Sequence, residues 1–73
     1  MPPFALKDAF NRYFHDGCST FTKHEVLAYG AGDRQRINQF LAEWEAKGQL
    51  QVIKSLDQAS DGDVMVKLLK VIA

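Results

Sequence analysis

The clearest apolar repeat in the chain lies between Asp33 and Gly48. Its large apolar residues recur at i, i+3, i+4 and i+7, the spacing of one stripe of an α-helix. They are Ile37, Phe40, Leu41 and Trp44. Asp33 is suited to accept hydrogen bonds from the free N–H groups of a first helical turn, and Lys47 followed by Gly48 is typical of a helix end. The pattern predicts a helix over residues 34–47.

Two more helices are predicted nearer the N-terminus. Over residues 4–15, apolar residues recur at i, i+4, i+7 and i+8 with charged residues between them, and Asp16-Gly17 ends this helix. Thr22-Lys23-His24-Glu25 matches the capping box, in which a Thr hydroxyl and a Glu carboxylate bond each other's backbone amides. A short helix over residues 23–29 is therefore expected, and the preceding Cys18–Phe21 is compatible with a brief edge strand.

Beyond Gly48 the pattern becomes that of strands. Residues 49–56 contain a short apolar run, residues 57–63 are turn-forming, and residues 64–72 are rich in β-branched side chains. These features predict a β-hairpin with strands at about 49–56 and 64–72 and a loop at 57–63. Residues 64–72 also fit a helical stripe, but the β-branched content and the preceding loop favour the strand. The expected class is α+β, with three helices followed by a hairpin.

Composition places the chain among ordinary folded proteins. It has 73 residues, 47% of them apolar and 25% charged, which predicts a single domain over residues 1–73. No apolar run approaches the length of a membrane span, and the N-terminus lacks the layout of a signal peptide. The single cysteine, Cys18, is consistent with a reducing compartment. We therefore expect a cytoplasmic protein without a membrane partner.

Charge limits the kind of partner. Nine basic side chains balance nine acidic ones, so the formal net charge is zero. Strong non-specific binding of nucleic acid requires a basic patch, so a net charge of zero argues against such binding. A locally basic face is still compatible with the balance.

The face of the 34–47 helix opposite its apolar stripe is composed of amides and small side chains. It comprises Gln35, Gln39, Ala42 and Ala46, with Asn38 on one flank and Arg36 and Glu43 on the other. Asn, Gln and Arg make bidentate contacts with base edges in the DNA major groove, and small residues allow a helix to come close. The face is therefore a candidate DNA-binding surface. The alternative is a solvated helix face that is rich in amides.

Other site chemistry is weakly represented. His15, Cys18 and His24 are metal-ligating residue types, but a zinc site needs three or four converging ligands and these lie on three different predicted segments. The acidic loop 57–63 lacks the ligand spacing and the terminal Glu of a calcium-binding EF-hand loop. We expect no metal, no cofactor and no enzymatic activity.

The order of helix, short strand, helix, turn, helix and hairpin resembles that of the winged-helix family of helix-turn-helix domains. The resemblance rests on the capped helix 22–29, the Gly30–Gly32 turn, the apolar stripe of the 34–47 helix, and the junction Glu45–Leu50, in which a long helix passes through Lys-Gly to an apolar strand. It covers nearly the whole chain and includes no catalytic signature.

The resemblance implies a small DNA-binding protein, a transcriptional or phage-type regulator, whose 34–47 helix lies in the major groove of double-stranded DNA. Gln35, Asn38 and Gln39 would then contact bases, and Arg34 and Arg36 phosphates or guanine. Lys23 and His24 would sit where the free N–H groups of the 23–29 helix meet a phosphate. One domain gives a small interface, so a homodimer or a protein partner is expected to add affinity.

The hairpin loop departs from the family pattern. DNA-binding winged helices usually offer Lys or Arg from the wing, whereas this loop carries Asp57, Asp61 and Asp63 and no basic residue. Carboxylates repel a polyanion. The alternative function is therefore a winged-helix protein-protein interaction module, an adaptor or complex subunit that does not bind DNA.

Overall fold

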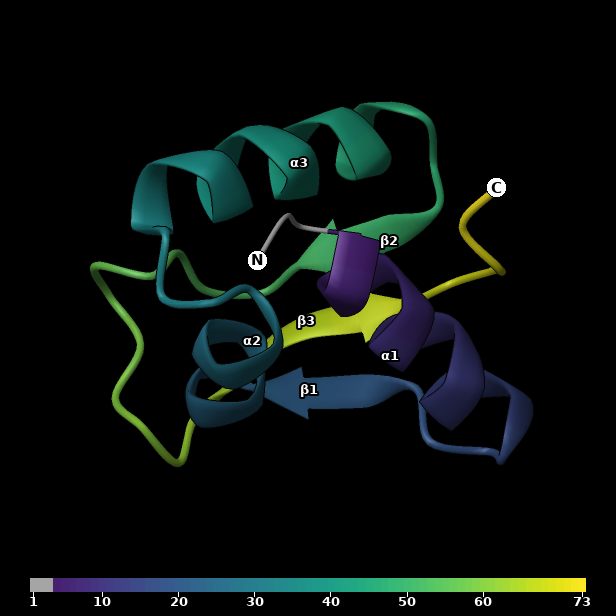
Figure 1. Cartoon of the computed structure of the whole chain (residues 1–73), viewed down its shortest axis with the longest axis horizontal. Coiled ribbons are helices and arrows are strands. Elements are labelled where there is room, and N and C mark those ends of the chain that lie inside the picture. Colours follow the sequence, from purple (N-terminus) through teal and green to yellow (C-terminus); the bar gives the residue numbers. More distant parts are fainter. Residues whose placement is uncertain (1–3) are drawn as a thin grey trace.

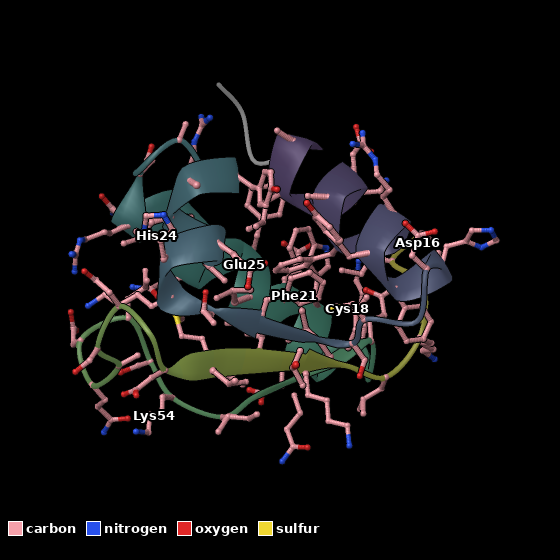
Figure 2. All side chains as sticks on the ribbon, turned by 90° about the horizontal axis from the view of Figure 1, so that it is seen from below. Asp16, Cys18, Phe21, His24, Glu25 and Lys54 are labelled. Atoms are coloured by element: carbon pink, nitrogen blue, oxygen red, sulfur yellow. The ribbon has the colours of Figure 1, made fainter. Side chains whose placement is uncertain are left out.

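Three helices lie on one face of a small antiparallel sheet in the computed structural model, which describes residues 4–73 (Figures 1 and 2). Residues 1–3 of the expected domain lie outside the described part. The elements in chain order are α1 (Phe4–His15), β1 (Thr20–Thr22), α2 (Lys23–Tyr29), α3 (Arg34–Ala46), β2 (Leu50–Val52) and β3 (Val64–Leu68). The chain is thus a small α+β domain, and its three helices span nearly the same residues as the predicted ones.

Local chemistry fixes the start of α2. The Thr22 hydroxyl accepts from the Glu25 amide at 3.3 Å, and the Glu25 carboxylate accepts from the Thr22 amide at 3.0 Å. These are the two bonds of the predicted capping box. At the other end of α2, Gly30 is buried against Ile37, where an added Cβ would clash with the Ile37 side chain. The lack of a side chain at Gly30 therefore lets α2 and α3 pack closely.

The sheet has the strand order β1-β3-β2, and both of its strand pairs are antiparallel. The hairpin strands are shorter than the predicted 49–56 and 64–72. The amides of Ile53 and Lys54 both donate to the carbonyl of Met65, so the ladder is interrupted after Val52. Paired amides on one carbonyl are typical of a β-bulge, in which an extra residue disrupts the pairing. Periodicity in the sequence does not reveal such an interruption.

The same interruption recurs at the other end of the hairpin. There the amides of Leu69 and Lys70 both donate to the carbonyl of Gln49, and β3 ends at Leu68. The register of β1 on β3 also shifts, because Phe21 pairs with Val66 and Thr22 with Val64. The skipped residue, Met65, is therefore buried beside Val66 instead of alternating to the outer face.

The loop between the strands is longer than predicted and is not a free wing. It runs over residues 53–63, and within it the side chains of Leu56 and Ala59 are only 0% and 4% exposed. The Ser55 carbonyl accepts from the amides of Gln58 and Ala59, which closes a turn that directs both apolar side chains inward. The loop is thus folded back onto the domain.

The core lies between the helices and the inner face of the sheet. Figure 2 shows Phe21 of β1 pointing from the sheet towards the helices, and its ring lies 4.5 Å from that of Phe10. Among the described residues, the fully buried large side chains are Leu6, Phe10, Phe21, Val26, Ile37, Leu50, Leu56, Met65, Val66, Leu68 and Ile72. None of the helices of the described part has the length and apolar character needed to cross a membrane.

The last residues of the chain are attached to α1. The Asn11 side chain donates to the Ile72 carbonyl at 2.9 Å and accepts from the Ile72 amide at 2.8 Å. These two bonds hold the buried Ile72 side chain, which is 1% exposed, against the core. The segment after β3 is therefore part of the fold, although it is neither the strand nor the helix that the sequence allowed.

Candidate nucleic-acid interface

The helix α3 is fixed by its ends and by its apolar stripe. The Asp33 carboxylate accepts from the Arg36 amide at 3.2 Å and caps the first turn, as the sequence predicts. The stripe residues Ile37, Leu41 and Trp44 are 0%, 3% and 6% exposed. Burial of this stripe fixes the rotation of α3, so the residues on its opposite side must face outward.

That outward side holds most of the predicted site residues. Arg34, Gln35, Arg36, Asn38 and Gln39 are all exposed and lie in the first half of α3. Within residues 4–73, none of these five side chains takes part in a hydrogen bond or ion pair with another residue. Their donors and acceptors are therefore free to bind an external molecule. We name this set of five side chains the α3 outer face.

The two arginines lie on opposite flanks of the α3 outer face. Each is one residue from Gln35, so at about 100° per residue they point to either side of it. Glu43 and Glu45 are each one residue from Trp44 and point to either side of it. Near the other end of the helix, Glu43 therefore lies on the flank of Arg36, and Glu45 lies on the flank of Arg34. The α3 helix thus carries a positive pair at its beginning and a negative pair towards its end.

The negative pair is partly engaged by neighbours. Glu43 lies 3.6 Å from the Lys47 ammonium in an exposed ion pair. Glu45 accepts from the Val52 amide of β2 at 2.9 Å. The flanking positions of Glu45 and Arg34 follow from helical periodicity and could have been found in the sequence. The bond to Val52 could not, because it depends on how β2 lies beside α3.

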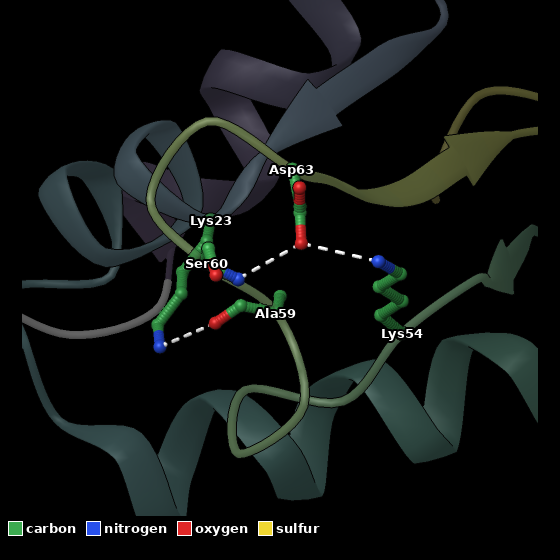
Figure 3. Close-up of polar contacts among 5 residues, drawn as sticks. All are labelled: Lys23, Lys54, Ala59, Ser60 and Asp63. Carbon is green, nitrogen blue, oxygen red and sulfur yellow. Dashed lines mark hydrogen bonds and ion pairs between the residues drawn. The ribbon is translucent and has the colours of Figure 1, made fainter.

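The beginning of α2 does not provide the phosphate site that the sequence suggested. The amide of Lys23 donates to the Asp63 carbonyl at 3.0 Å, and that of His24 to the Asp61 carbonyl at 3.2 Å. The Lys23 ammonium donates to the Ala59 carbonyl at 2.8 Å (Figure 3). The expected free N–H groups are therefore occupied by the loop 53–63. Of Lys23 and His24, the residue with an exposed side chain is His24 (Figure 2).

The acidic loop also neutralises part of its own charge. Asp63 accepts from the Ser60 amide at 3.0 Å and from the Lys54 ammonium at 3.1 Å (Figure 3). The Ser60 hydrogen bond, and then the positive charge of Lys54, lower the pKa of the Asp63 carboxyl below its usual 3.8. Asp57 and Asp61 remain exposed. Of the three carboxylates of the loop, Asp63 is therefore the one that is held and partly neutralised within the loop.

The surface of the described residues offers no enclosed site. It has no pocket, and no three His, Cys, Asp or Glu side chains of the described part converge to hold a metal ion. His15, Cys18 and His24, the metal-ligating types considered above, are all exposed.

Protein-family models, curated proteins and solved structures were each compared with the chain, and none of them matches it.

Proposed function

We propose that this chain is a winged-helix domain that binds double-stranded DNA through the α3 outer face. The order helix, strand, two helices and hairpin, on which the resemblance to that family rests, is the order of the elements in the fold. The proposal gives α3 the part of the recognition helix in a major groove. A role in transcriptional or phage-type regulation would follow from sequence-specific binding.

The observation that carries the proposal is the absence of intramolecular partners for the α3 outer face within residues 4–73. A surface helix that is merely solvated usually carries Lys and Glu in i, i+4 pairs, such as Glu43 with Lys47 in the last turn of α3. The first half of the helix instead presents three amides and two guanidinium groups, and each amide offers both a donor and an acceptor to a base edge.

The domain is expected to bind weakly as a monomer. Its net charge is zero, and a single small module contacts few phosphates. A test is the affinity of the chain for random-sequence duplex DNA over a series of salt concentrations. The proposal predicts binding at low ionic strength that weakens steadily as salt is added. No binding at low salt, or binding that does not depend on salt, would exclude this function.

A second candidate function is that of a protein-interaction module. The observation that favours it is the exposure of four large apolar side chains, all in the part of the chain after α3: Ile53 at 48%, Val64 at 38%, Leu69 at 52% and Val71 at 56%. Apolar side chains on the surface of a small domain are typical of contacts with another protein, although single exposed ones are common.

The acidic loop separates the two functions experimentally. Asp63 holds the loop through Ser60 and Lys54, so the informative variant exchanges only Asp57 and Asp61 for Asn. If DNA is the partner, this variant binds duplex DNA as tightly as the wild type or more tightly, because repulsion of the phosphates is reduced. If the domain is an interaction module that uses the loop, neither wild type nor the variant binds duplex DNA. The variant then binds the protein partner more weakly than wild type does.

A further inference from the structure

The two halves of α3 differ in both charge and hydrogen-bonding capacity. The first half places Arg34 and Arg36 on its two flanks with amide side chains between them. The second half places Glu43 and Glu45 on the same flanks with only Ala42 and Ala46 between them. The side of the helix that faces away from the core thus changes along its length from cationic and polar to anionic and small.

The phosphates of a DNA duplex would interact differently with the two halves of α3. A helix that lies along a major groove has a chain of phosphates on each side, so charges on both flanks face negative groups. Arginines attract the phosphates on both sides at the first half. At the second half Lys47 offsets the charge of Glu43, so the repulsion comes mainly from Glu45, which accepts from the Val52 amide but forms no ion pair within residues 4–73. Lys47 lies beside Glu43 and cannot relieve Glu45, which is on the other flank. The charges therefore favour a docked helix whose second half is tilted away from the DNA.

We infer that α3 enters the major groove by the segment Arg34–Gln39 alone and that this segment selects adenine-containing base pairs. The inference rests on the proposed function and specifies its ligand. Asn and Gln side chains pair bidentately with the N6 amino group and N7 of adenine. The exposed amides of this segment are Gln35, Asn38 and Gln39, and none is engaged elsewhere in residues 4–73.

The length of the segment sets the size of the site. Five steps of about 1.5 Å carry the helix about 7.5 Å from the first residue of the segment to the last. Base pairs are stacked about 3.4 Å apart, so the amides reach two or three of them. The ligand of one domain is thus a short run of base pairs that includes adenine, flanked by phosphates within reach of Arg34 and Arg36.

The experiment is a selection from duplexes with a randomised central segment, retained by the wild-type chain at low ionic strength. Adenine is expected to be enriched at two or three adjacent positions. The enriched duplex is then made with 7-deazaadenine at those positions, which removes the N7 acceptor and keeps Watson–Crick pairing. Loss of bidentate contacts is expected to weaken binding about fivefold or more.

Two variants locate the selectivity on α3. Combined Gln35→Ala, Asn38→Ala and Gln39→Ala should abolish the discrimination between adenine and 7-deazaadenine. The matched control, Ala46→Gln, places a new amide on the outward side of the second half and should leave the discrimination unchanged. Thermal unfolding checks that both variants are folded, as expected for exchanges at exposed helical positions.

The possible results are separable. Salt-dependent retention of duplexes without adenine enrichment, or an unchanged affinity for the 7-deazaadenine duplex, would overturn the adenine inference and leave DNA binding intact. A change in base preference on Ala46→Gln would overturn docking by the first half alone. Failure to retain any duplex at low ionic strength would overturn the proposed function, and the inference with it.

Discussion

The loop 53–63 and the α3 outer face are both exposed, polar and charged, yet their side chains are used differently. In the loop, Asp63 is bonded to Ser60 and Lys54, and the Ala59 carbonyl accepts from Lys23. On the α3 outer face, no side chain is bonded to another residue of the described part. Polar groups that already have partners hold the fold together, and those without partners are available to a ligand.

Because of this difference, the acidic loop is weaker evidence against DNA binding in the fold than in the sequence. In the sequence, three aspartates in a hairpin loop argue against DNA as a partner. In the fold, Asp63 is paired with Lys54, and the backbone of the loop is attached to the beginning of α2. The loop is therefore first a structural element, and its charge is a weaker argument against DNA than its composition suggests.

Shortening the buried loop side chain should give the largest effect on stability. Leu56 is fully buried, so Leu56→Ala removes apolar contacts and leaves a cavity. The expected loss is about 2–5 kcal/mol in the free energy of unfolding, measured by urea denaturation. The exposed neighbour Gln58→Ala is the control and should change it by less than about 0.5 kcal/mol. Equal, small effects of both exchanges would show that the loop does not pack on the core.

Acid should weaken the loop through Asp63. Its pKa is lowered in the folded state, so its contribution to stability is present above the usual 3.8 and is lost as the pH falls through the lowered folded value. At about pH 7 the midpoint of urea unfolding should therefore be higher for wild type than for Asp63→Asn. The difference between the two midpoints should become smaller at about pH 2–3. A difference that is the same at both pH values would contradict a stabilising Asp63 carboxylate.

Exchanges on the α3 outer face should have the smallest effect on stability. Gln35→Ala, Asn38→Ala and Gln39→Ala remove no intramolecular bond of the described part and introduce a good helix former. Each should change the free energy of unfolding by less than about 0.5 kcal/mol, measured in the same urea titration. A loss of about 2 kcal/mol or more from any of them would show that this side chain stabilises the fold, as the side chains of the loop do.

Local signals in the sequence were sufficient for the helices. The apolar stripe of α3, the Asp33 cap and the capping box at Thr22 depend on residues within about one or two helical turns, and each forms as expected. The direction of the α3 outer face follows from the same periodicity. For this reason its five exposed candidates could be named before the structure was known.

Contacts between distant segments were not predictable in this way. The bulges at Met65 and Gln49, which shorten the hairpin strands, depend on the pairing of two strands. The bond between Asn11 and Ile72 joins residues 61 positions apart. The loop amides and carbonyls that occupy the beginning of α2 are likewise far from it in sequence, which is why Lys23 and His24 seemed free to meet a phosphate.

The salt dependence of duplex DNA binding by wild type and by the double variant Arg34→Ala and Arg36→Ala tests directly whether α3 is the DNA-binding surface. Fluorescence anisotropy of a labelled duplex gives the slope of log affinity against log salt. If α3 binds DNA, wild type binds at low salt and the variant binds more weakly, with a slope smaller by up to about two. Lys67→Ala with Lys70→Ala, which removes the same charge from β3 and the segment after it, should change the slope less. Absence of wild-type binding at low salt, or equal slopes for wild type and the arginine variant, would show that the α3 outer face is not a DNA-binding surface.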